Sequence, residues 1–395
     1  MTRSLSPLSL ITAILLLGGL VGGALFLGDL ADHGGKSAYA LLIGGGLGYV
    51  FQRSRFCFYC NIRDAFEGRG TGPVLGILAA LAVGGVGYAV LMSTWLPNPR
   101  LGLLPPEAHI GPVSPVLVAA GLAFGFGMVL SGSCISGHLY RLAEGSTRAP
   151  FALAGTVVGF ILGFLVWDSL YLDLISEAPV PWLPASIGYG GSLGLMLAVL
   201  ALLALLLLPG MKRAPDAARP ASPYLALAQQ VLVRRWSPVV GGALVGALAT
   251  LSYFKVQPLG VTAEIGSLAR TAAAELGWLQ GRLIGLDGFA GCATKVIQTI
   301  SDNGLLVAGL VAGAFAGALP AGQFQPVRHP APAYATALAG GVLLGFGAML
   351  ALGCTVGVLL SGIMAFALSG WVFALAMLVA IRLGLILNRR FSPRA

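Results

Sequence analysis

Long runs of apolar residues recur along the whole chain and are separated by short polar segments. A helix needs about 20 apolar residues to cross the hydrocarbon core of a membrane, and most of the runs approach that length. They lie at about 8–28, 37–52, 73–96, 112–131, 151–168, 186–208, 238–254, 304–320, 333–352 and 370–388. The pattern predicts an all-α polytopic membrane protein with about nine or ten transmembrane helices.

One apolar unit is written twice. GLAFGFGMVLSGSCISGHLY spans Gly121 to Tyr140, and GVLLGFGAMLALGCTVGVLL spans Gly341 to Leu360, at an offset of 220 residues without a gap. Glycines four residues apart let helix backbones approach closely in lipid. Each copy ends in a cysteine followed by a Gly/Ser/Thr-rich break, as in transporters whose binding sites are built from broken helices. The repeat therefore predicts two inverted-repeat membrane halves.

Charge is sparse and unevenly placed. Only 9% of the residues are charged and 57% are hydrophobic, which excludes a water-soluble fold. The net charge of +9 comes from short basic segments beside apolar runs, which is the positive-inside pattern and no sign of nucleic-acid binding. These segments are 53–69, 141–148, 212–235 and 382–394. We expect them, and with them the C-terminus, on the cytoplasmic side of the membrane.

The expected domain organisation follows from these runs. Residues 1–36 form an extra N-terminal transmembrane helix, residues 37–209 the first membrane half, residues 210–237 a basic cytoplasmic linker, and residues 238–395 the second half. A signal peptide is the alternative for residues 1–28, but an apolar run of about 20 residues favours a retained helix. The segment 255–302 carries eight charges, so short re-entrant helices are expected there.

Four cysteines are candidate substrate-binding residues: Cys57, Cys134, Cys292 and Cys354. A single buried cysteine is usually only a small hydrophobic residue. However, Cys134 and Cys354 occupy matching positions of the repeat, and packing does not require a sulfur twice at a helix break. Amides freed at a helix start attract anions, and a thiol is a soft, weak donor. Together they favour binding of a soft, sulfur-containing anion.

Basic residues near these cysteines can gather the anion. Lys295 follows Cys292 by three residues, on nearly the same face of a helix, and Arg55 precedes Cys57 by two. Arg53 and Arg282 are further candidates, although cations at a membrane interface also simply extend to water. The sequence contains no readable metal, phosphate-loop, dinucleotide or catalytic-triad motif, so we predict no cofactor, no metal site and no catalytic residues.

Two further residues have alternative interpretations. Cys57 and Cys60 form a C-x-x-C motif, which in a soluble redox protein indicates a dithiol centre. We assign Cys60 to packing, and expect serine at this position to do little. His138, four residues after Cys134, can serve as an acid or base, or as a hydrogen-bonded packing residue.

The chain resembles the YeeE/YedE family of bacterial sulfur-compound membrane transporters. The resemblance runs from about Gly44 onward through four motifs: FQRSRFCF, GSCISGHLYR, DGFAGCATKVIQTISDNG and GFGAMLALGCTVG. It implies a monomeric, two-halved permease that takes up thiosulfate along a line of cysteines, which are Cys57, Cys134 and Cys354, with Cys292 in a fourth motif. It also implies a cytoplasmic partner like the TusA sulfur carrier. This chain contains no carrier domain of its own.

These observations predict an inner-membrane permease, not an enzyme, that imports thiosulfate or a related sulfur-containing anion. Three alternatives stay open. The first is a selenium-compound transporter of the same family. The second is a membrane thiol enzyme, either a disulfide oxidoreductase using Cys57 and Cys60 or a sulfurtransferase. The third is a structural membrane subunit.

Overall fold

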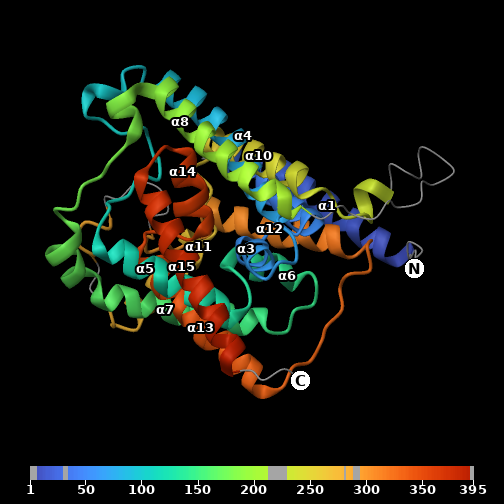
Figure 1. Cartoon of the computed structure of the whole chain (residues 1–395). Helices are drawn as coiled ribbons and strands as arrows, with labels where there is room; N and C mark the ends of the chain where they lie inside the picture. Colours follow the sequence, from blue (N-terminus) through green and yellow to red (C-terminus); the bar gives the residue numbers. More distant parts are fainter. Residues whose placement is uncertain (1–6, 30–33, 212–228, 280–281, 288–293, 392–395) are drawn as a thin grey trace.

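The fold is almost entirely helical. A computed structural model describes residues 7–29, 34–211, 229–279, 282–287 and 294–391 (Figure 1). Its long helices are α1 (Pro7–Gly28), α2 (Gly34–Ser54), α4 (Gly72–Trp95), α5 (Pro115–Ser131), α7 (Ala149–Leu170), α8 (Leu183–Leu207), α10 (Pro238–Lys255), α12 (Asp302–Ala318), α13 (Ala331–Leu350) and α15 (Leu368–Phe391). The short ones are α3 (Phe58–Phe66), η1 (Pro99–Leu101), α6 (Ile135–Leu142), η2 (Tyr171–Ile175), η3 (Leu208–Gly210), α11 (Thr262–Glu275), η4 (Thr355–Ser361) and α14 (Gly362–Met364). The ten long helices lie where the ten apolar runs predict them.

Eight segments of the described chain are long and apolar enough to cross a membrane. The exceptions among the long helices are α12, which has only 17 residues, and α2, which carries Lys36 and Arg53 near its two ends. Both pack along much of their length against each other and against neighbouring spans, which makes them part of the same bundle. The protein is therefore a multi-pass helical membrane protein with short helices between its spans, as predicted.

The first helix group pairs helices from the first part of the sequence with helices from its second part. Helix α2 lies along α12, and α4 lies along α10 (Figure 1). Gly44 meets Leu306 and Gly48 meets Leu310, so α2 and α12 run in the same direction. Gly76 meets Pro238 and Gly87 meets Thr250, so α4 and α10 are also parallel. Glycines at these contacts let the backbones touch, which is how membrane helices gain packing energy.

The second helix group contains the repeated unit. Helix α13 packs between α5 and α7, and α15 packs on α5. Gly127 of α5 meets Gly340 of α13, whereas Ala120 meets Gly347, so these two helices run in opposite directions. They carry the two copies of the repeat. The two copies of the repeat therefore run in opposite directions, which the prediction of inverted halves requires.

The basic segments that the sequence separates meet at one end of the molecule. Arg53 of α2 donates to the carbonyl oxygen of Leu232 at 2.7 Å, and Arg235 forms an ion pair with Glu144 at 3.4 Å. Arg382 of α15 reaches the carbonyl oxygen of Phe66 at 3.4 Å. We call this the basic end. Its counterpart at the other end of the helices holds the turns before α5 and after α13.

The charged segment 255–302 contains one described helix, α11, which has 14 residues and is too short to span a membrane. Its two buried charged residues, Arg270 and Glu264, have partners. Arg270, with only 3% of its side chain exposed, contacts Asp287 at 2.6 Å and donates to the carbonyl oxygen of Thr294 at 2.7 Å. Glu264 accepts a hydrogen bond from Ser301. A short shielded helix with paired charges is what the charge pattern predicts.

Candidate functional site

Three short helical segments each begin directly after a cysteine. Cys57 precedes α3, Cys134 precedes α6, and Cys354 precedes η4. The breaks have local causes. Gly132 adopts a left-handed φ of 85° and ends α5, whereas Leu352 (φ 60°) and Gly353 (φ 156°) turn the chain after α13. Each cysteine therefore lies at a helix start, where backbone N–H groups have no helical partner.

Cys57 and Cys134 lie in contact, although 77 residues separate them. Their sulfur atoms are 3.7 Å apart, and both residues have 0% exposure. The hydroxyl of Ser133 is 3.4 Å from the Cys57 sulfur, and the hydroxyl of Ser136 is 3.4 Å from the Cys134 sulfur. We call this group of side chains the dithiol site. Gly137 packs against it without a side chain, and a Cβ at this position would meet the Ser133 hydroxyl and both sulfurs, so the site leaves no room there for even a methyl group.

Cys354 occupies the corresponding break in the other repeat, away from the dithiol site. Its sulfur accepts the backbone N–H of Val356 at 3.4 Å, and the hydroxyl of Thr262, at the start of α11, lies beside it. The adjacent Thr355 hydroxyl is buried without a hydrogen-bond partner among the described residues. Thus one thiol with two hydroxyls lies at this break, where the dithiol site has two thiols with two hydroxyls.

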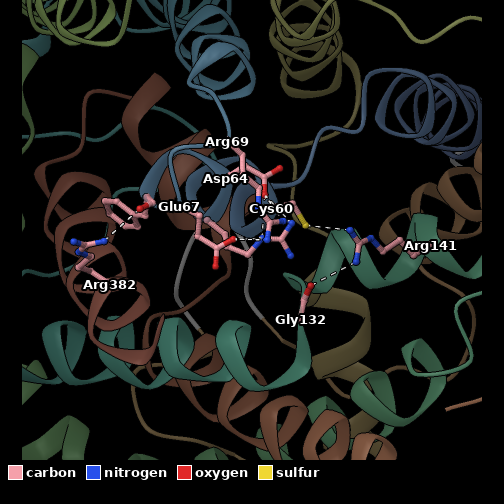
Figure 2. A network of polar contacts seen from close by, with 9 residues as sticks. Cys60, Asp64, Glu67, Arg69, Gly132, Arg141 and Arg382 are labelled. Atoms are coloured by element: carbon pink, nitrogen blue, oxygen red, sulfur yellow. Dashed lines mark hydrogen bonds and ion pairs between the residues drawn. The ribbon is translucent and has the colours of Figure 1, made fainter. Parts of the chain in front are cut away.

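Cys60, for which the sequence predicts a packing role, faces a guanidinium group. Nη2 of Arg141 donates to the Cys60 sulfur at 3.1 Å, and Nη1 of Arg141 is 3.5 Å from the carbonyl oxygen of Gly132 (Figure 2). Cys60 also lies beside Cys57, which precedes it by about one helical turn. The described cysteines form no disulfide, so all four of them are thiols.

Cys60 and Arg141 also line a cavity of about 470 Å³. We call it the basic cavity, because four arginines and two carboxylates line it: Arg55, Arg63, Arg141, Arg235, Asp64 and Glu144. Arg55 is exposed and has a φ of 52°, which reverses the chain between α2 and Cys57. Burial and then the like charge of Arg55 lower the pKa of Arg235, as expected where positive charges are crowded.

The remaining predicted site residues lie elsewhere or outside the described residues. Lys295 is exposed, and its backbone N–H donates to the hydroxyl of Ser267 at 3.0 Å. The structure therefore does not bring Lys295 to the dithiol site. Cys292 lies outside the residues that the structure describes.

Two buried histidines accompany the thiols. His138 lies in α6, and neither of its ring nitrogens has a hydrogen-bond partner within the described chain. His109, which the sequence analysis did not single out, lies in the connection before α5 with its ring against Gly353. Burial lowers the pKa of His109 to about 4, so its imidazole is neutral near pH 7. No local motif marks this residue, because the glycine that its ring contacts, Gly353, lies far away in the sequence.

Chemically, the site offers weak, soft hydrogen-bond donors inside an apolar bundle, with the arginines of the basic cavity beside them. A thiol donates a weak hydrogen bond, and buried thiols bind a soft atom without holding it tightly. Conduction requires binding that is favourable enough to admit an ion and weak enough to release it. The bundle of apolar helices defines a multi-pass membrane protein with buried thiols at its helix breaks.

Comparison with known proteins places this membrane protein in a family. The chain belongs to the sulphur-transport (YeeE/YedE) family, whose model matches residues 53–383. It is 26% identical over 333 residues to the thiosulfate transporter TsuA of Escherichia coli, covering 84% of this chain and 88% of that protein. It is 28% identical over 348 residues to TsuA of Spirochaeta thermophila, covering 84% and 92% respectively. A probable transporter, YedE of Salmonella typhimurium, is 31% identical over 150 residues, covering 38% of this chain and 34% of the relative.

The family and the relatives agree with the prediction of a transporter rather than an enzyme. They also agree with a sulfur-containing anion as the substrate class.

Proposed function

We propose that the chain imports thiosulfate, or a closely related sulfur-containing anion, across the bacterial inner membrane. In this proposal Cys354, Cys134 and Cys57 are successive contact points for the ion, and Cys292 is a further one. The observation that carries the proposal is the dithiol site, in which two wholly buried sulfurs lie 3.7 Å apart at the starts of two helices.

The chemistry of the dithiol site suits a thiosulfate-like ion at both ends. The ion's terminal sulfur is soft and accepts weak S–H hydrogen bonds, whereas its oxygens suit hydroxyls and free amides. Ser133 and Ser136 supply hydroxyls beside the two thiols. Because the sulfurs are not paired in a disulfide and belong to different helices, they can contact an ion together without covalent chemistry.

The same proposal assigns an orientation and partners. The basic end faces the cytoplasm, in line with the positive-inside rule, so the C-terminus also lies there. Residues 37–209 and 238–395 are the two halves, joined by the linker 210–237 behind the N-terminal helix. A monomer is sufficient, since one chain supplies both copies of the repeat. A cytoplasmic TusA-like sulfur carrier would receive the ion at the basic end.

The test is uptake of labelled thiosulfate by cells that lack their own thiosulfate uptake and express this chain. Serine at Cys57, Cys134 or Cys354 keeps the size and a donor but replaces a soft group with a hard one. Loss of one contact worth about 1.4 kcal/mol costs about tenfold in affinity. We therefore expect each variant, normalised to its amount in the membrane, to retain less than about a tenth of the uptake.

Two outcomes would redirect the proposal. Full uptake by both the Cys134→Ser and Cys354→Ser variants would end the role of these thiols in transport. Uptake of a selenium compound in place of thiosulfate would keep the thiol pathway and change the substrate. The oxidoreductase alternative requires Cys57 and Cys60 together and tolerates serine at Cys134.

A further inference from the structure

The basic cavity has more positive than negative charge. Four arginines face two carboxylates, which leaves an excess of two positive charges. Arg63 pairs with Asp64 at 2.8 Å, and Arg235 pairs with Glu144 at 3.4 Å. Arg55 and Arg141 have no carboxylate within ion-pair distance in the described part of the chain. Cations in a confined space without counter-ions attract an anion, and a dianion matches the excess charge.

The cavity is connected to the dithiol site through a line of side chains. Cys57 touches Cys134, and Cys60 lies beside Cys57 on the next turn. Arg141 then contacts Cys60 at 3.1 Å (Figure 2). Both residues line the basic cavity. The sulfur of Cys60 accepts a hydrogen bond from Arg141, so its own S–H remains available to donate to a ligand.

Arg141 has donor capacity left over. Its Nε is buried without a hydrogen-bond partner among the described residues. A guanidinium presents five N–H donors in a planar fork that matches an oxyanion, and an unused donor in a buried position is costly. An oxyanion in the cavity would use this donor capacity, and no carboxylate of the described chain does.

We propose that the basic cavity is a binding site for the transported sulfur oxyanion on its way out of the dithiol site. Arg141 and Arg55 bind the oxygens of the ion, and the Cys60 thiol contacts its sulfur. This exit site rests on the proposed transport function. It gives Cys60 a role in the pathway and makes Arg141 a substrate-binding residue.

The exit site makes a kinetic prediction. Arg141→Gln removes the charge at the step after the dithiol site, so the maximal uptake rate falls about tenfold. The KM for external thiosulfate stays within about threefold, because entry from the other end is unchanged. Arg141→Lys keeps the charge but not the planar fork, and recovers part of the rate. Arg382→Gln is the matched control, since it removes the same charge from the basic end without lining the cavity.

Binding is tested directly by alkylation of Cys60. Purified full-length protein receives a short pulse of a small maleimide, and mass spectrometry measures the modification of each cysteine. A cysteine-containing reference peptide in the same tube corrects for reagent that thiosulfate consumes. We expect thiosulfate to slow the alkylation of Cys60 at least fivefold relative to sulfate of equal ionic strength. The protection should be lost in Arg141→Gln and kept in Arg382→Gln.

The outcomes separate this inference from the proposed function. If the wild-type protein transports thiosulfate but thiosulfate leaves Cys60 alkylation unchanged, the exit site is wrong and the transport function stands. If thiosulfate protects Cys60 without any uptake, the anion site stands and the transport function is wrong. If neither occurs, both are overturned. Equal protection in Arg141→Gln and the wild type would remove Arg141 from the site, and Cys60→Ala identifies the Cys60 signal.

Discussion

A single added methyl group at Gly137 would test whether the ion passes the dithiol site. Gly137 lies on α6 one turn after Cys134, and a Cβ built on it would be 2.9 Å from the sulfur of Cys57 and 3.3 Å from that of Cys134. It would come still closer to the hydroxyl of Ser133. Gly137→Ala therefore presses a methyl group against both thiols and removes neither of them.

The size of the effect follows from these distances. Non-bonded contacts are ordinarily about 3.5–4.0 Å, so the Cys57 sulfur must move by at least about 0.6 Å. Overpacking of this kind costs about 1–3 kcal/mol. Replacing glycine by alanine inside a helix returns about 1 kcal/mol. The net loss of stability is thus about 0–2 kcal/mol, which a folded protein tolerates. A binding constellation must be held within about 0.5 Å, so uptake should fall at least tenfold.

The assay measures labelled thiosulfate uptake and the melting temperature of the same purified variant. Gly194→Ala on α8 is the control, because a Cβ there has no heavy atom within 4 Å. It should leave uptake unchanged. Wild-type uptake by a well-expressed Gly137→Ala variant would refute the reasoning, since it would show that transport does not depend on how these thiols are held.

Three further predictions concern protonation, packing and oxidation. His109 has a pKa of about 4 when folded and about 6.5 when unfolded, so the unfolded chain binds the proton first and stability is lost as pH falls below about 6.5. At pH 5 the loss is about 2 kcal/mol. In thermal melts His109→Gln should remove that slope, and an unchanged slope would contradict the assignment. A Cβ at Gly48 would overlap the carbonyl oxygen of Leu310, so Gly48→Ala should lower the melting temperature, with an expected cost of about 1–3 kcal/mol, whereas Gly19→Ala, with open space around it, should not. Diamide, which takes two electrons and two protons from a pair of thiols, should link Cys57 to Cys134 and leave Cys354 unlinked, as read by peptide mass spectrometry. A Cys57–Cys60 link as the main product would instead favour the redox alternative.

The sequence predicts the helices well, because length and hydropathy leave few alternatives in a membrane. The apolar runs locate the long helices, and the repeat locates the breaks at Cys134 and Cys354. The opposite directions of α5 and α13 follow from alternation of the basic segments, which is a property of the whole chain. These features depend on local composition or on the number and order of the apolar and basic segments, and both can be read from a single sequence.

Contacts between distant segments could not be predicted in the same way. The C-x-x-C motif suggests that Cys57 has its partner three residues away, yet its sulfur is in contact with Cys134 as well. Cys60 looks like a packing residue until Arg141 is placed beside it, 81 positions along the chain. The sequence contained one weak indication that Arg141 lies near the cysteines. Arg141 follows Cys134 by seven residues, about two helical turns, so both residues lie on the same side of a helix. Only the fold shows that these two short helices face each other.

The two breaks differ chemically although the halves repeat. At the start of α6 the ion would meet two thiols, with a third thiol and a guanidinium beyond them. At the start of η4 it would meet one thiol beside the hydroxyls of Thr262 and Thr355. A hydroxyl is a harder donor than a thiol, so the donors as a group are softer at the α6 break, which has the additional thiol. Positive charge also increases in that direction, because Arg141 lies beside Cys60. An inverted repeat alone would give equal sites at its two ends. Under the proposed transport function, the second thiol at the dithiol site and the arginine beside Cys60 would give the pathway a direction in its binding chemistry.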